Sequence, residues 1–132
     1  MILLLKLTAI IEAATGLALI AAPAIVVRVL FGAEISGASI PLGRVAGAAL
    51  LALGIACWLA RGDTQSRTTK GLVVAMLMYN IVATAVLAFA GIGLRLHGVL
   101  LWPAVVLHAV MGAWCVACLR RGLQNEAMTV TK

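Results

Sequence analysis

Four long apolar runs dominate the hydrophobic pattern of the chain, at about 1–22, 40–60, 71–91 and 99–119. Each run is close to the roughly 20 residues that a helix needs to cross about 30 Å of hydrocarbon. None shows the alternating pattern of a half-buried strand, and an open sheet cannot span lipid. The pattern therefore predicts an all-α fold, an integral membrane four-helix bundle formed by one transmembrane domain over residues 1–119.

A short apolar segment follows the first run. Pro23 closes that run, and residues 24–31 then continue apolar around Arg28, with Gly32 placed to end a helix. Proline suits the first position of a helix, so the segment is predicted to be a short helix lying along the membrane interface. The alternative is that the first span is simply long and tilted. Residues 120–132, after the fourth run, are predicted to be a polar tail on the cytoplasmic side.

Composition supports a membrane protein. Hydrophobic residues make up 64% of the chain and charged residues 11%, which is too few charges for the surface of a soluble domain. The clearest polar interval, 61–70, is too short to hold such a domain. Within it, Thr68 or Thr69 is placed to cap the third long helix.

The net charge is +6, and the positions of the basic residues are more informative than the total. Basic residues lie at the edges of the apolar runs and not on one clustered face, so we expect contact with the lipid bilayer and no nucleic-acid partner. Four spans place both termini and the 61–70 loop on one side. That side carries all the lysines and arginines except Arg28, Arg44 and Arg95. The positive-inside rule then predicts that both termini lie in the cytoplasm.

A layer of polar residues is predicted near the middle of the membrane. Glu12, Asn80 and His108 are the only Glu, Asn and His within the apolar runs. At 1.5 Å per residue they lie roughly 16, 14 and 17 Å from the cytoplasmic edge. Arg44 lies about 6 Å below the outer edge, from where its side chain can reach the headgroups or turn inward. Glu12 also disfavours a cleaved signal peptide, whose apolar region would have to contain it.

Two interpretations of this layer remain open. Burial in hydrocarbon favours the neutral form of a carboxyl, so Glu12 could be a proton or cation site, with His108 as a second titrating group and Asn80 as an orienting hydrogen-bonder. Alternatively the layer locks helix packing, with Glu12 bonded to Asn80 or His108, or paired with Arg44.

Redox and metal chemistry find less support in the sequence. Cys115 and Cys118 form a C-x-x-C that is a possible redox pair, but the charge distribution places it on the reducing side, where buried cysteine acts as a small apolar residue. His97 and His108 lie three helical turns apart on one segment, too far to share a haem iron. Because Glu12 and His108 are the only strong ligands inside the membrane, we expect no metal and no cofactor.

Several short motifs carry a resemblance to a known family. Glu12 is followed by Gly-Leu-Ala-Leu and, at the end of the run, by Pro23; the second run begins with Arg44-x-x-Gly47; and the fourth contains Trp-Pro and His108. Together they resemble the DoxX-like superfamily of small bacterial inner-membrane proteins. The resemblance implies a four-helix membrane bundle and, in some members, partnership with quinone-linked oxidoreductases. It brings no established catalytic residues.

A second similarity is to small multidrug-resistance transporters, which also carry a single Glu in the first of four helices and exchange protons for cationic drugs as dimers. Arg44 and the scarcity of aromatic residues depart from that pattern.

Three functional hypotheses follow, and the pattern favours a non-catalytic protein over an enzyme. The first is a subunit or scaffold of a larger membrane complex, which would dock helices through small-residue faces at Gly43 and Gly47 and at Ala109, Ala113 and Ala117. The second is a homodimeric, proton-coupled small transporter that uses Glu12. The third is a thiol or quinone oxidoreductase.

Overall fold

The protein is all-helical in a computed structural model that describes the backbone of residues 1–64 and 66–130, and their side chains as far as 122 and at 124. The helices are α1 (Ile2–Ala21), α2 (Pro23–Phe31), α3 (Ser39–Ala60), α4 (Arg67–Ile92) and α5 (Leu101–Val130). All except α2 are long and apolar enough to cross a bilayer. The predicted all-α fold with four long apolar helices is therefore confirmed.

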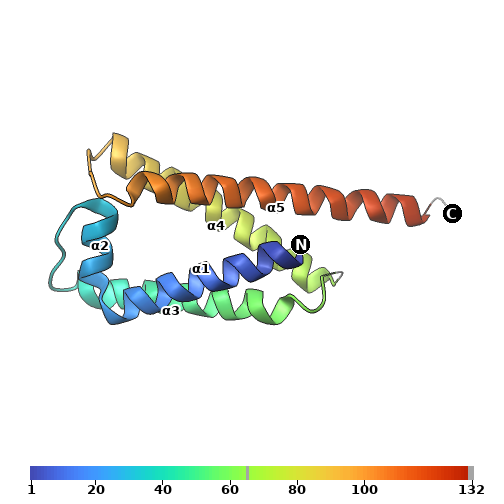
Figure 1. Cartoon of the computed structure of the whole chain (residues 1–132), viewed down its shortest axis with the longest axis horizontal. Coiled ribbons are helices and arrows are strands. Elements are labelled where there is room, and N and C mark those ends of the chain that lie inside the picture. The colour runs from blue at the N-terminus through green and yellow to red at the C-terminus, as the bar shows by residue number, and fades with distance from the viewer. Residues whose placement is uncertain (65, 131–132) are drawn as a thin grey trace.

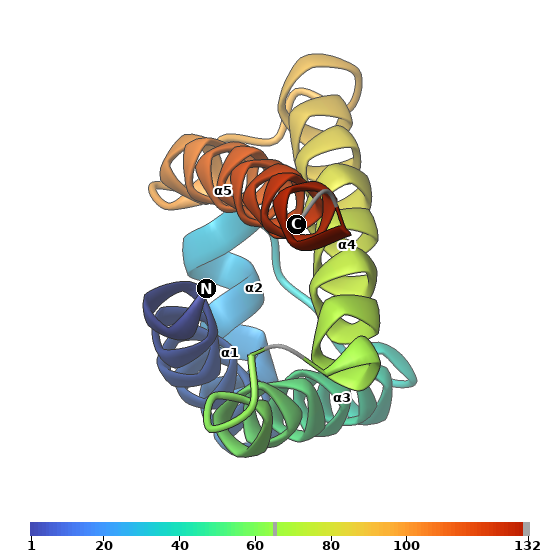
Figure 2. The same cartoon turned by 90° about the vertical axis from the view of Figure 1, so that its right-hand side faces the viewer.

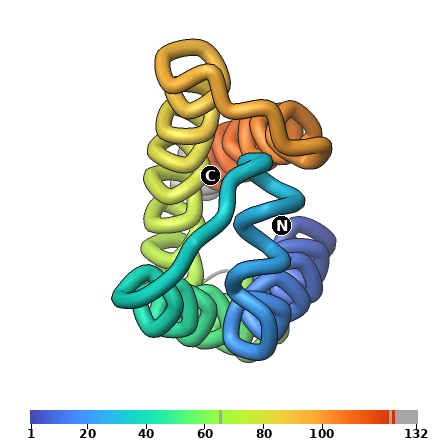
Figure 3. Tube along the Cα trace, turned by 90° about the vertical axis from the view of Figure 1, so that its left-hand side faces the viewer, coloured from blue at the N-terminus to red at the C-terminus, as the bar shows by residue number. Residues whose placement is uncertain are grey.

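The short helix α2 is separated from α1 by a break in the backbone. Ala22 has φ −141° and ψ 63°, which no helix continues through, and Pro23 then occupies the first turn of α2. Gly32 ends α2 in the left-handed conformation, at φ 69°. The prediction of a short helix after the first span is confirmed, and the alternative of one long first helix is wrong. Figures 1 and 3 show α2 lying across the end of the bundle.

The long helices place both chain ends at the same end of the bundle. In Figure 1 the N-terminus, the connection between α3 and α4, and the C-terminal part of α5 lie at the right, whereas α2 and the α4–α5 connection lie at the left. Helix α5 continues to Val130, past the predicted end of the fourth span at 119. The predicted polar tail is thus helical as far as Val130, and its last two residues lie outside the described part of the chain.

Helices α1 and α3 form one closely packed pair and α4 and α5 a second pair, as the view along the bundle shows (Figure 2). Glycine allows the first pair to approach so closely. A Cβ on Gly47 would lie 2.7 Å from the carbonyl oxygen of Gly16, and one on Gly54 would lie 2.9 Å from the carbonyl oxygen of Ala9. The small residues therefore bring the two backbones into direct contact.

An apolar core joins the two pairs near the end that holds the termini. Its buried members come from all four long helices: Leu4, Leu5, Ala9, Cys57, Val73, Met76, Met111 and Cys115. From this core the pairs separate toward α2, because α1 and α5 diverge along the bundle (Figure 1). The bundle is consequently filled by side chains at one end and covered by α2 at the other.

Helix α4 begins earlier than the sequence pattern indicates. It starts at Arg67 because Ser66, in an extended conformation, accepts a hydrogen bond on its Oγ from the Thr69 backbone N–H at 3.1 Å. The predicted caps, Thr68 and Thr69, are therefore wrong. The Thr69 hydroxyl instead donates to the carbonyl oxygen of Asp63 at 2.7 Å and ties the preceding turn to the helix.

Replacement of Ser66 by alanine is expected to lower the free energy of unfolding by about 1 kcal/mol, the typical contribution of an N-cap serine. The exchange of the Thr69 amide proton should accelerate, because that N–H loses its acceptor. Thr68→Ala is the matched control, since Thr68 is exposed and lies in the same turn. Hydrogen exchange of both variants in nanodiscs measures the effect, and equal protection of the Thr69 amide in the two would contradict the assignment of the cap.

Candidate intramembrane binding site

Glu12 lies inside the bundle, on the face of α1 that packs against its neighbours. Thr8 and Gly16, one turn to either side of it, are buried on the same face, and Glu12 itself is only 5% exposed. The Tyr79 hydroxyl of α4 donates to Oε2 of Glu12 across 3.4 Å. This distance is long for a hydrogen bond between oxygens, so the carboxyl keeps acceptor capacity for another partner.

Asn80, which follows Tyr79 on α4, faces α5. Its side-chain amide donates from Nδ2 to the Met76 carbonyl oxygen at 2.8 Å, and its Oδ1 lies 2.9 Å from Nδ1 of His108. Asn80 is 2% exposed, so both of its polar atoms are held by protein groups in the bundle interior. The interaction with Asn80 therefore fixes the Nδ1 edge of the His108 ring.

Tyr79 joins these two interactions. Its ring packs edge-on against the His108 ring, with the centroids 5.4 Å apart and the planes at 83°. Glu12, Tyr79, His108 and Asn80 therefore form one continuous group of side chains from three helices, which we call the polar cluster. The prediction placed Glu12, Asn80 and His108 in one layer, and the structure joins them through Tyr79.

A cavity of about 550 Å³ opens beside the polar cluster, on the side of α2. Its polar wall consists of Glu12, Tyr79 and His108 at the end nearest the apolar core and Thr15 one turn further along α1. The remaining wall is apolar: Ile11, Ala14, Ala18, Ile25, Val26, Val29, Leu30, Leu87, Leu100, Pro103, Ala104 and Leu107. Its volume and its few convergent polar groups are those of a small-molecule site.

Arg44 lies apart from the polar cluster. It is exposed on α3 and makes no ion pair or hydrogen bond with the residues that the structure describes. The pairing of Glu12 with Arg44, one of the alternatives left open by the sequence, is therefore absent from this arrangement, and so is a direct bond from Glu12 to Asn80 or His108. No lysine or arginine of the described chain lines the cavity.

The cysteines lie toward the other end of the bundle. Cys57 of α3 and Cys115 of α5 are fully buried in the apolar core, and Cys118 is half-buried beside it. All three are free thiols. Within the described residues, no three His, Cys, Asp or Glu side chains are grouped so that they could hold a metal ion.

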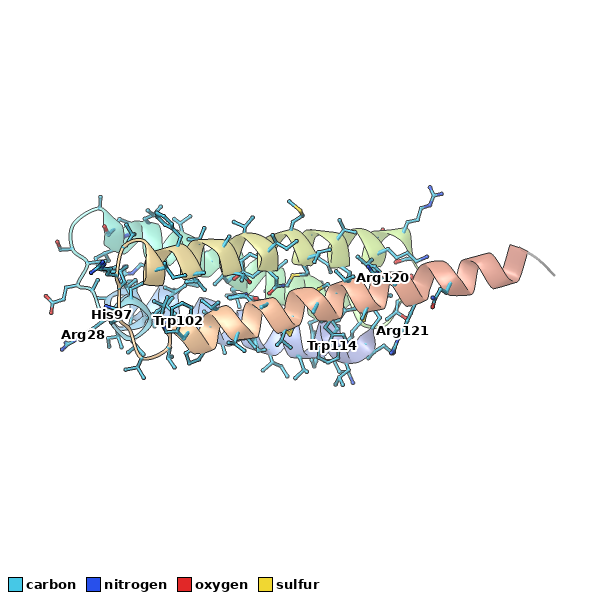
Figure 4. All side chains as sticks on the ribbon, turned by 90° about the horizontal axis from the view of Figure 1, so that it is seen from above. Arg28, His97, Trp102, Trp114, Arg120 and Arg121 are labelled. Carbon is cyan, nitrogen blue, oxygen red and sulfur yellow. The ribbon has the colours of Figure 1, made fainter. Side chains whose placement is uncertain are left out.

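Aromatic and basic side chains mark the two ends of the bundle. Arg28, His97 and Trp102 lie at the end covered by α2, and Arg120 and Arg121 lie at the opposite end, with Trp114 nearer the core (Figure 4). At the end of α3, the guanidinium of Arg61 lies 3.8 Å above the Trp58 ring and donates to the Trp58 carbonyl oxygen. Such pairs of aromatic and basic residues are typical of the two interfaces of a membrane protein.

Tyr79 is the member of the polar cluster that the sequence interpretation did not place there. The helical stripe that includes Asn80 also contains Met76 and Thr84, whereas Tyr79 is turned about 100° away from it. The available signal was its position: it is the only tyrosine of the chain and lies at the same depth as Asn80.

The fold and the site together define a class: a small multi-pass helical membrane protein with a carboxyl-lined cavity between its spans. Comparison of the chain with protein-family models, with characterised proteins and with solved structures found no match.

Proposed function

We propose that this protein binds a small amphiphilic cation within the membrane and exchanges it for a proton at Glu12. The observation that carries the proposal is that the buried Glu12 lines a cavity whose wall is mostly apolar. An ionisable residue inside a membrane bundle is costly and is generally retained for such a task.

The chemistry of the exchange balances in charge. In the proposed cycle Glu12 carries a proton before the ligand enters, because a buried carboxyl without a counter-charge is more stable in its neutral form. When a monovalent cation enters, the carboxylate pairs with it and the proton leaves, so one positive charge replaces another. The apolar walls that rise from Glu12 toward α2 would then cover the hydrocarbon part of the ligand.

Replacement of Glu12 by glutamine should abolish proton release driven by the ligand. We expect the wild-type protein, in weakly buffered nanodiscs, to release protons when N,N-dimethyloctylamine is added in its protonated form. Thr15→Val is the matched control, because Thr15 also lines the cavity but carries no charge. A pH-indicator dye measures the release. Release of equal size from Glu12→Gln and from wild type would sink the proposal.

We also propose an orientation in the membrane and a family for the protein. An inner-membrane location with both termini in the cytoplasm is supported by the excess of lysine and arginine at the end that holds the termini. The resemblance to the DoxX-like superfamily agrees with a small helical bundle of this kind.

A second candidate is a subunit or scaffold of a larger membrane complex. It is favoured by an outward-facing groove of about 410 Å³ between α4 and α5, which is lined by small residues including Ala85, Ala88, Ala109 and Ala113. Small residues allow another helix to approach closely. Co-purification of a partner in mild detergent, lost in Ala113→Leu, would support this role, and a protein that remains stable alone would count against it.

A further inference from the structure

The side-chain amide of Asn80 determines which nitrogen of His108 carries the proton. Nδ2 of Asn80 donates to the Met76 carbonyl oxygen at 2.8 Å, which fixes the orientation of the amide and leaves Oδ1 toward His108. An amide oxygen can only accept a hydrogen bond. His108 must therefore donate from Nδ1 across the 2.9 Å to Asn80.

A neutral imidazole with its proton on Nδ1 has an acceptor at Nε2. This nitrogen makes no hydrogen bond with the described residues, yet no polar side-chain atom of that part of the chain is both buried and unpartnered. The surface of Nε2 is therefore accessible and not fully enclosed by protein atoms. Asn80 holds the Nδ1 edge of the ring and lines the outward groove but not the cavity, whereas His108 lines both. This arrangement favours a position of the opposite edge of the ring, which bears Nε2, on the cavity side.

Two acceptors thus face one cavity. Once Glu12 has released its proton, the first is its carboxylate, which the Tyr79 hydroxyl satisfies only weakly at 3.4 Å, and the second is Nε2 of His108. No fixed cation of the described chain lines the cavity to compensate them. A ligand that satisfies both needs a positive charge and at least one N–H group, because a positive charge alone leaves the second acceptor unpaired.

We infer that the cavity selects protonated amines that carry an N–H group and discriminates against quaternary ammonium ions of the same charge and chain length. The amine lies with its head between Glu12 and His108 and with its alkyl chain along the apolar wall formed by α2, by Leu100, and by Pro103, Ala104 and Leu107 of α5. His108 is here a specificity-determining residue for the site, whose use as a cation site rests on the proposed function. A site built to hydrogen-bond its ligand strongly rejects an analogue that lacks the group.

A matched pair of ligands tests the inference. N,N-Dimethyloctylamine, protonated at neutral pH, and octyltrimethylammonium share a charge and a chain but differ in one N–H. We expect the amine to bind wild-type protein in nanodiscs about ten-fold more tightly or better, as measured by calorimetry, because a hydrogen bond to a charged donor is lost in the second ligand. In His108→Phe the preference should fall to near one, through weaker binding of the amine and unchanged binding of the quaternary ion.

The outcomes separate the inference from the proposed function. If wild-type protein binds the two ligands with equal affinity, the inferred selectivity is wrong but the proposed exchange at Glu12 is unaffected. If it binds neither ligand, both the selectivity and the proposed exchange are wrong. Nitrogen-15 NMR spectra of the wild-type protein test the inference without any substitution. They should show the His108 proton on Nδ1 and a shift of Nε2 when the amine binds; a proton on Nε2 in the free protein overturns the inference.

Discussion

Replacement of Gly47 by leucine is expected to unfold most of the protein in mild detergent. A Cβ at this position would lie 2.7 Å from the Gly16 carbonyl oxygen, 2.8 Å from the Leu19 Cβ and 2.9 Å from the Ile20 nitrogen. Two of these neighbours are backbone atoms of α1, which cannot turn aside as a side chain does. The helices α1 and α3 must then separate along much of their length. The cost should exceed the 1–3 kcal/mol typical of an overpacked core, out of a total stability of about 5–15 kcal/mol.

Gly71→Leu is the control for this substitution. Gly71 also lies within a long helix, α4, but a Cβ there meets nothing within 4 Å. We expect its free energy of unfolding, measured by a denaturing-detergent titration, to remain within about 0.5 kcal/mol of wild type, as for ordinary surface changes. A midpoint for Gly47→Leu that matches that of Gly71→Leu would show that α1 and α3 do not pack as described.

Replacement of Gly98 by valine is expected to displace α2 from the end of the bundle. A Cβ on Gly98 would overlap the Leu30 carbonyl oxygen, at the point where the Leu100 N–H donates to the Val29 carbonyl oxygen across 3.2 Å. The α4–α5 connection must then move away from α2, and this hydrogen bond is lost. Because Val29 and Leu30 line the cavity, the cavity loses part of its apolar wall as well.

The effect of Gly98→Val is measured by hydrogen exchange of the Leu100 amide, which should become about ten-fold faster or more, the equivalent of about 1.4 kcal/mol in local opening. Gly62→Val is the control in the opposite loop, since a Cβ on Gly62 meets nothing within 4 Å. Amine binding should weaken in Gly98→Val alone. Unchanged protection of Leu100 would contradict the contact between α2 and the α4–α5 connection.

The long helices could be predicted from the sequence because the apolar runs match the thickness of a bilayer, a constraint that acts on each segment separately. The short α2 was also predictable, since Pro23 and Gly32 are local signals for its two ends. The start of α4 was misplaced by a few residues because Ser66, Thr68 and Thr69 are chemically similar caps. Only the conformation of the loop decides among them.

The candidate site was only partly predictable. Its depth follows from counting residues along each helix, which placed Glu12, Asn80 and His108 in one layer. The partners within that layer depend on how the helices rotate against one another, and a single sequence does not contain this information. The position of Tyr79 between Glu12 and His108 therefore could not be predicted. The position of Arg44 outside the polar cluster could not be predicted either. The cavity itself arises from the divergence of α1 and α5, a tertiary property that no local pattern encodes.

The apolar core that joins all four long helices at one end has a mechanical consequence. Because α1 packs closely against α3 and α4 against α5, a tilt of one pair relative to the other would pivot about this core. Such a tilt widens or narrows the far end most, where α2 bridges the gap. The part of the cavity wall that α2 contributes would therefore move relative to Glu12 in such a tilt.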